Sequence, residues 1–118
     1  MSSMSKVSFS KGDYIFFEGD VEAHFYIIES GQVKIFTKNS KGEKIELATL
    51  SDGETFGEFA LIGEGHRTAS AQAATDVKLM KVNEQGYKVM IESLPPWASS
   101  MMENLIARLK NMNQNLKK

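Results

Sequence analysis

Short β-strand patterns, each closed by a turn cluster, fill the first four-fifths of the chain and limit the folds that it can adopt. Aromatic and β-branched runs alternate at short intervals with clusters of Gly, Ser, Asn and Asp. This arrangement is typical of an antiparallel barrel or roll. The linker Ser30-Gly31 is tight enough to predict a β-hairpin between the strands that flank it. The expected strands are residues 14–17, 25–29, 33–37, 45–50, 68–73 and 77–82.

After residue 82 the apolar pattern changes to a helical period. Asn83 is a plausible N-cap for a short helix that ends near Glu92. Pro95-Pro96 ends this helix and permits a second one to begin near Trp97. The second helix carries one apolar stripe with helical spacing. The residues of this stripe are Met102, Leu105, Leu109, Met112 and Leu116.

Length and composition place these elements in one domain. The chain has 118 residues, of which 42% are hydrophobic and 25% charged, as in an ordinary globular domain. We therefore predict a single domain over residues 1–118 with a mainly β fold. An antiparallel β-roll, or jelly-roll-like barrel, is expected at about 7–82, and C-terminal helices at about 83–118.

Charge, cysteine content and histidine spacing argue against several functional classes. The net charge is −1, so the basic excess typical of a direct nucleic-acid partner is missing. No run of about 18 apolar residues predicts a membrane span, and the lack of cysteine fits a reducing cytoplasm. His24 and His66 lack the spacing of a metal site, and no catalytic set is evident. We expect a cytoplasmic protein that is not an enzyme and has no metal or cofactor.

The stretch from Gly53 to Ser70 carries the most specific chemistry. Gly57 opens a short apolar turn, where free backbone N–H groups bind anions and a glycine lets a ligand approach closely. Arg67 is one of two arginines, and its planar fork fits two phosphate oxygens. Glu58 beside an anion site fits a ligand that also carries a hydroxyl donor. A phosphate beside a sugar hydroxyl describes a nucleotide.

Residues 56–62 (FGEFALI) and 67–69 (RTA) resemble the phosphate-binding cassette of the cyclic nucleotide-binding domain family. This family is the β-roll module of the catabolite activator protein, the kinase regulatory subunits and the cyclic-nucleotide-gated channels. Arg67 follows Glu58 by nine positions, as in the family's cassette. The resemblance covers most of the chain, with Asp-Gly-Glu at 52–54 as a minor departure. It implies a roll with an inserted phosphate-binding cassette.

The resemblance also implies a role for each residue of the site. Glu58 would accept a hydrogen bond from the ribose 2′-hydroxyl, and Gly57 would lie close to the ribose. Arg67 would pair with the cyclic phosphate, helped by the backbone N–H groups of Ala60 and Thr68. The helix from Trp97 would form a lid over the base, where Arg108 could stack through its planar face. The expected ligand-binding residues are Phe56, Gly57, Glu58, Phe59, Ala60, Arg67, Thr68, Ala69 and Arg108.

These roles predict reversible binding of a cyclic nucleotide, with lid movement as the signal to an effector protein or a further domain. The expected ligand is cAMP, with cGMP as the second candidate, because Thr68 is compatible with both. One alternative is a β-roll interaction domain whose degenerate pocket binds no nucleotide and holds a salt bridge between Glu58 and Arg67. The apolar stripe of the second helix is either the lid contact or a dimer seam, which leaves a monomer or a weak homodimer.

Overall fold

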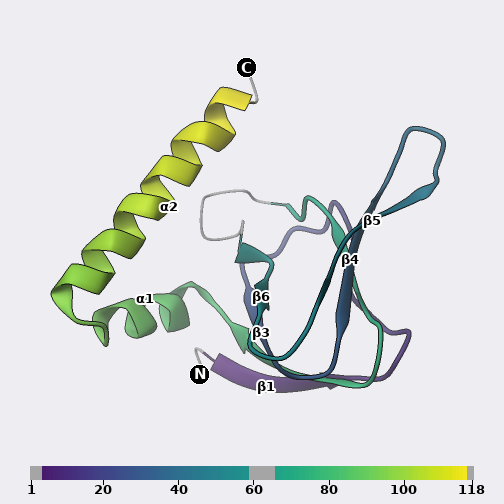
Figure 1. The fold of residues 1–118 in the computed structure, drawn as a ribbon, viewed down its shortest axis with the longest axis horizontal. Helices are drawn as coiled ribbons and strands as arrows, with labels where there is room; N and C mark the ends of the chain where they lie inside the picture. Colours follow the sequence, from purple (N-terminus) through teal and green to yellow (C-terminus); the bar gives the residue numbers. More distant parts are fainter. Residues whose placement is uncertain (1–3, 59–65, 117–118) are drawn as a thin grey trace.

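The computed structural model describes residues 4–58 and 66–116. Within them, two four-stranded sheets with antiparallel pairings are followed by two helices (Figure 1), which confirms the predicted mainly β fold. In the first sheet the strand order is β1 (Met4–Phe9), β8 (Val77–Val82), β3 (Phe25–Ser30) and β6 (Thr55–Phe56). In the second sheet it is β2 (Tyr14–Phe16), β7 (Ser70–Ala73), β4 (Val33–Lys38) and β5 (Lys44–Leu50).

The hydrophobic core lies between the two sheets, because alternate side chains of each strand point to opposite faces. Strand β8 buries Val77, Leu79 and Val82 in this core and leaves Lys78 exposed. Each such side chain contributes about 1.5–3 kcal/mol relative to an exposed position. At the edge of the second sheet, β5 is largely exposed. The largest fully buried side chains are Phe36, Ile28, Leu79, Val33, Val77 and Val82.

The turn between β3 and β4 differs from the sequence prediction. β3 pairs with β8 and β6, whereas β4 pairs with β5 and β7, so the predicted hairpin at Ser30-Gly31 is wrong. Gly31 has a φ of +105°, and its backbone N–H donates to Asp52 Oδ1 at 2.9 Å. A Cβ at Gly31 would lie 2.4 Å from the Asp76 carbonyl oxygen. The turn therefore carries the chain from one sheet to the other, at a point where only glycine fits.

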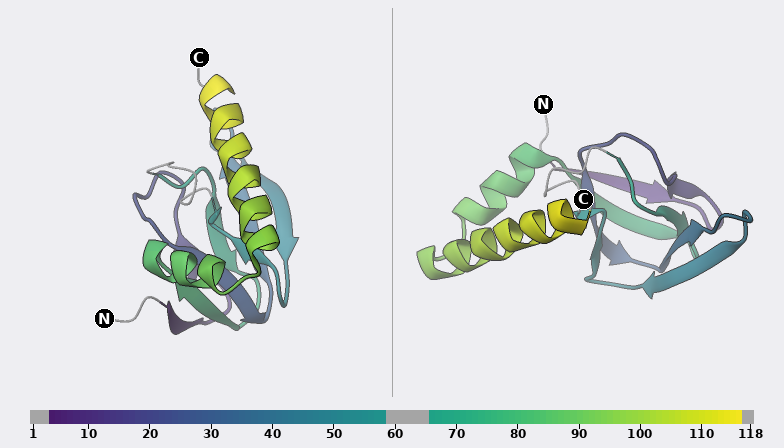
Figure 2. Two further views of the ribbon diagram at one scale, coloured as in Figure 1. Left: turned by 90° about the vertical axis from the view of Figure 1, so that its left-hand side faces the viewer. Right: turned by 90° about the horizontal axis from the view of Figure 1, so that it is seen from above.

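The C-terminal part forms α1 (Glu84–Glu92) and α2 (Pro96–Leu116). Asn83 Oδ1 accepts a hydrogen bond from the Gly86 N–H at 2.9 Å, which confirms Asn83 as the N-cap of α1. Both helices lie on one side of the roll, and α2 projects away from it (Figures 1 and 2). Within the described part of the chain, no helix combines the length and apolarity that a membrane crossing needs.

Candidate functional site

A pocket of about 330 Å³ opens on the roll where the β2–β3 loop meets strand β6 and residues 66–69. Its volume is in the range of small-ligand sites. One wall is apolar and comes from Ile35, Leu47 and Leu50 of the β4–β5 pair. The lining also includes polar and ionisable side chains, so the pocket suits a ligand that has both apolar and charged groups. The polar lining residues that matter below are Glu22, Thr55, Glu58, Arg67 and Thr68.

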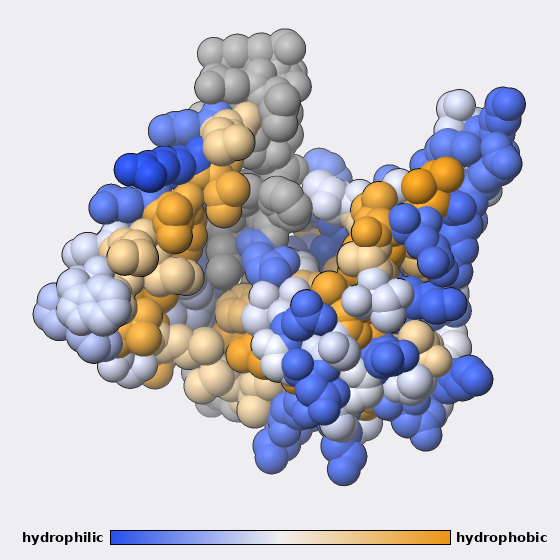
Figure 3. Space-filling view, viewed as in Figure 1, coloured by the Kyte–Doolittle hydropathy of each residue, from blue (hydrophilic) through white to orange (hydrophobic). Residues whose placement is uncertain are grey.

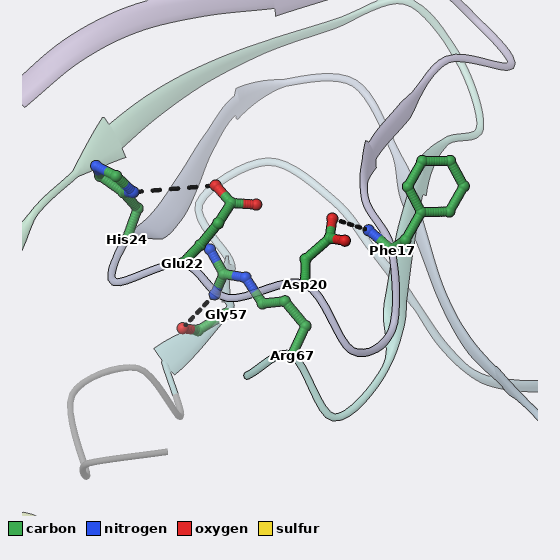
Figure 4. Close-up of polar contacts among 6 residues, drawn as sticks. All are labelled: Phe17, Asp20, Glu22, His24, Gly57 and Arg67. Carbon is green, nitrogen blue, oxygen red and sulfur yellow. Dashed lines mark hydrogen bonds and ion pairs between the residues drawn. The ribbon is translucent and has the colours of Figure 1, made fainter. Parts of the chain in front are cut away.

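Arg67 is held firmly at the base of this pocket and is only 4% exposed. Its Nη1 donates to the Gly57 carbonyl oxygen at 3.1 Å (Figure 4), and its guanidinium lies over the Phe16 ring at 4.1 Å from the centroid. Its backbone is fixed as well: the Arg67 N–H donates to the Asp20 carbonyl at 2.7 Å, and the Gly19 N–H donates to the Arg67 carbonyl at 2.8 Å. The positive charge of the Arg67 guanidinium is therefore held in a fixed position before any ligand binds.

Two guanidinium nitrogens of Arg67 remain unsatisfied. Nε and Nη2 are buried and have no hydrogen-bond partner among the described residues. Burial lowers the pKa of the Arg67 guanidinium, and the negative charge of Glu22 partly opposes that shift. Buried donors without partners are costly, by about 1–3 kcal/mol each and more when charged. An anionic ligand with two oxygens would satisfy both donors, so the geometry fits an oxyanion such as a phosphodiester.

Gly57 lies against the guanidinium of Arg67. It has a φ of +80°, which L side chains rarely adopt. A Cβ at this position would lie 2.8 Å from Arg67 Nη1 and 3.4 Å from the His24 carbonyl oxygen. Glycine is thus required both by the backbone conformation and by the close approach of Arg67.

Glu58 lies on the rim of the pocket and is exposed. Its Oε1 accepts a hydrogen bond from Thr55 Oγ1 at 2.7 Å. No ion pair joins Glu58 to Arg67 in residues 4–58 and 66–116, so the salt bridge considered for a degenerate pocket is not formed. A carboxylate accepts several hydrogen bonds, so Glu58 still has oxygen lone pairs for a ligand hydroxyl.

A comparison with known protein families identifies the family of the chain. Residues 6–93, about three quarters of the chain, match the family model of the cyclic nucleotide-binding domain. The chain belongs to the cyclic nucleotide-binding domain family. The sequence resemblance is therefore confirmed. Gly57 and Arg67 of the predicted cassette line the pocket of this cyclic nucleotide-binding domain, and their roles in binding stay a prediction.

Individual relatives agree with this assignment. The cyclic AMP receptor protein of Thermus thermophilus is 34% identical over 116 residues, which are 98% of this chain and 54% of that protein. The human potassium/sodium hyperpolarization-activated cyclic nucleotide-gated channel 2 is 34% identical over 106 residues, 90% of this chain and 11% of the channel. The chain thus spans about half the length of the Thermus relative and a small part of the channel.

Solved structures share the same fold. The half-site-occupied form of the EAL enzyme Bd1971 is 37% identical, with a TM-score of 0.84, over 92% of this chain and 97% of that chain. The same enzyme is also solved in a cAMP-bound and a cGMP-bound form. The catabolite activator protein of Thermus thermophilus has a TM-score of 0.76 at 33% identity, over 98% of this chain and 54% of that one.

The remaining predicted site residues of the domain fall into three groups. Thr68 and Ala69 line the pocket with Arg67. Phe56 also lines it, but it is 3% exposed and stacks on Tyr26 with 5.1 Å between the ring centroids, so it belongs equally to the core. Phe59 and Ala60 lie outside the described residues. Arg108 is exposed on α2 and does not line the pocket in this arrangement.

Two parts of the pocket were not assigned a role from the sequence. Glu22 lies in the β2–β3 loop, far from the cassette in sequence, and lines the pocket beside Arg67. The sequence predicts the face of the strand on which Leu47 lies. It does not predict that this face forms the pocket wall, because that depends on the pairing of β5 with β4. The sequence held one signal for Glu22: it follows Gly19-Asp20 by two residues, and the backbone of that pair is hydrogen-bonded to Arg67.

Proposed function

We propose that this domain reversibly binds a cyclic nucleotide, with cAMP as the preferred ligand and cGMP as the second candidate. The buried Arg67 with two unpaired donors at a small pocket is the observation that carries this proposal. Binding of cAMP or cGMP by the EAL enzyme Bd1971, and the name of the Thermus receptor, support the choice of ligand class.

The binding mode follows from the charges of the pocket. The cyclic phosphate would approach Nε and Nη2 of Arg67, where its oxygens would supply the hydrogen-bond acceptors that these two buried donors lack. The ribose 2′-hydroxyl would donate to Glu58, which Thr55 already orients. The purine would then face the apolar wall that contains Leu47. The phosphate, the ribose hydroxyl and the purine would thus each contact a protein group of complementary polarity.

We further propose that α2 closes over the bound base and transmits the signal. Figure 3 shows an apolar stripe on α2 and a second apolar area on the β4–β5 hairpin, facing each other across the hollow between them. Leu105 is 46% exposed and Leu109 is 48% exposed on α2, and Leu47 is 57% exposed on β5. Closure would bury these surfaces at about 25 cal/mol per Å². It would also bring Arg108 toward the base, so binding is coupled to movement of α2.

The proposed role is regulatory and non-enzymatic. The relatives include a cyclic AMP receptor protein and a cyclic nucleotide-gated channel, in which this domain is a part of a longer protein. The downstream partner would accordingly be an effector protein or a further domain that responds to α2. The alternative is an interaction domain that keeps the fold and binds no nucleotide.

Calorimetric titration of the domain with cAMP, cGMP and 5′-AMP tests the proposal. We expect saturable one-site binding of cAMP, weaker binding of cGMP, and the weakest binding of 5′-AMP, whose phosphate lacks the ring ester that orients it. Absence of binding for both cyclic nucleotides would instead support the interaction domain. A preference for cGMP above about tenfold, or 1.4 kcal/mol, would show that the base site is misassigned.

A further inference from the structure

A second carboxylate, Glu22, lies in the pocket beside the phosphate arginine. The β2–β3 loop that carries it is fastened to Arg67 on both sides, through the Asp20 carbonyl at 2.7 Å and the Gly19 N–H at 2.8 Å. Glu22 follows Asp20 by two residues and lines the same pocket as Arg67 and Glu58. Figure 4 shows the Glu22 side chain between the His24 ring and the Arg67 guanidinium. Its position is thus set by the backbone bonds to Arg67 itself.

The charges around Arg67 make Glu22 its main compensating anion. Burial lowers the pKa of Arg67, and Glu22 is the largest of the influences that raise it again, ahead of Tyr26 and Asp20. Asp20 Oδ2 already accepts a hydrogen bond from the Phe17 N–H at 2.9 Å. The nearest ion-pair contact of Glu22 is long, at 4.0 Å from Oε1 to His24 Nδ1. Glu22 therefore acts on Arg67 as a nearby charge without a direct contact.

We propose that Glu22 is a resident counter-charge that stabilises the empty pocket and weakens the binding of cyclic nucleotide. This inference rests on the proposed function, because it concerns the same site. In the empty protein the carboxylate offsets the buried positive charge of Arg67. When the ligand phosphate reaches Arg67, the same carboxylate faces a second anion. Glu22 therefore sets the affinity of the site and keeps the empty state well populated.

The two effects have opposite signs and can be separated. The attraction between Glu22 and Arg67 exists with and without ligand, so it contributes to folding stability and not to affinity. The repulsion between Glu22 and the phosphate exists only in the complex, so it appears only in affinity. Removing the charge should accordingly destabilise the empty protein and tighten binding, whereas a purely structural residue would weaken both.

The test compares Glu22→Gln with two matched variants. Glu29→Gln removes the same charge from an exposed position outside the pocket lining, and Glu58→Gln removes the other carboxylate of the pocket. We measure cAMP affinity by calorimetry and the melting temperature of the ligand-free protein. For Glu22→Gln we expect cAMP binding about three- to tenfold tighter and a melting temperature lower by about 4 °C. Glu29→Gln should change neither quantity, and Glu58→Gln should weaken binding.

Each other outcome overturns part of the account. Unchanged or weaker cAMP binding by Glu22→Gln would refute the repulsion between Glu22 and the phosphate. An unchanged melting temperature would refute the stabilisation of Arg67 by Glu22. Equal effects in Glu29→Gln would show that the changes in cAMP affinity and in melting temperature both follow from the net charge of the protein alone. If Glu22→Gln does not fold, Glu22→Asp must keep the melting temperature and affinity close to those of the native protein. If the native protein binds no cAMP, the proposed function fails, while the melting experiment still decides whether Glu22 compensates Arg67.

Discussion

Replacing Gly57 by alanine tests the contact on which the proposed phosphate site depends. The backbone at Gly57 has a φ of +80°, and the new Cβ would lie 2.8 Å from Arg67 Nη1, where an ordinary contact begins at 3.4 Å. The guanidinium must therefore move by about 0.6 Å. That movement disrupts the 3.1 Å hydrogen bond from Nη1 to the Gly57 carbonyl and displaces the two unpaired donors.

Gly42→Ala is the matched control, because Gly42 has a φ of +81° and no atom within 4 Å of the added Cβ. The left-handed conformation costs alanine about 1–2 kcal/mol, and the restricted unfolded chain returns about 0.4–1 kcal/mol. Both variants should therefore lose about 1 kcal/mol of unfolding free energy from the backbone. Gly57→Ala should lose about 1 kcal/mol more through the damaged hydrogen bond.

Urea denaturation and cAMP titration of the two variants separate these effects. We expect cAMP affinity to fall at least about tenfold in Gly57→Ala, or 1.4 kcal/mol, and to stay unchanged in Gly42→Ala. Equal loss of stability in the two variants, together with unchanged affinity in both, would show that Arg67 accommodates the methyl group and that the reasoning is wrong.

Three further predictions concern single side chains in the pocket lining or next to it. In Glu58→Ala, the affinity penalty for 2′-deoxy-cAMP should mostly vanish, because the two changes remove one contact; calorimetry that finds fully additive penalties would refute it. Thr68→Ala should weaken cGMP more than cAMP in parallel titrations, and an equal loss would exclude Thr68 from base selection. Burial, and next the charge of Lys81, lower the pKa of His24 from 6.5, with a smaller contribution from Arg67, while Glu22 raises it. As the pH falls, His24 is therefore protonated in the unfolded chain before it is protonated in the folded protein, so the free energy of unfolding should decrease below about pH 6.5. Urea titrations should show a smaller decrease for His24→Gln, and identical pH profiles of the two proteins would contradict this role of His24.

Local sequence patterns predicted the elements whose signals are complete within a few residues. The largely apolar run Val77–Val82 after the turn residues 74–76 predicted β8 with its observed bounds, and Asn83 marked the start of α1. The strand Met4–Phe9 was not predicted, because it is a partly exposed edge strand whose alternation is weak. The short β6 was missed because two residues carry no periodicity.

Long-range pairing explains the remaining differences. Gly31 and its neighbours look like a hairpin turn, but their backbone N–H groups bind Asp52 and Thr75 from distant turns. Those contacts direct β3 and β4 into different sheets, and no local pattern contains that information. For the same reason the cassette residues Glu58 and Arg67 were found as a motif, whereas Glu22 became part of the site only through the fold.

The central claim is that Arg67 holds the phosphate of a cyclic nucleotide, and calorimetric titration of Arg67→Ala with cAMP tests it most directly. Losing the partner of a buried phosphate costs about 2–5 kcal/mol, so affinity should fall about 30-fold or more. Circular dichroism should show that the variant keeps the β-roll, because two of the three guanidinium nitrogens have no hydrogen-bond partner among the described residues. A folded Arg67→Ala variant that binds cAMP with native affinity would contradict the account.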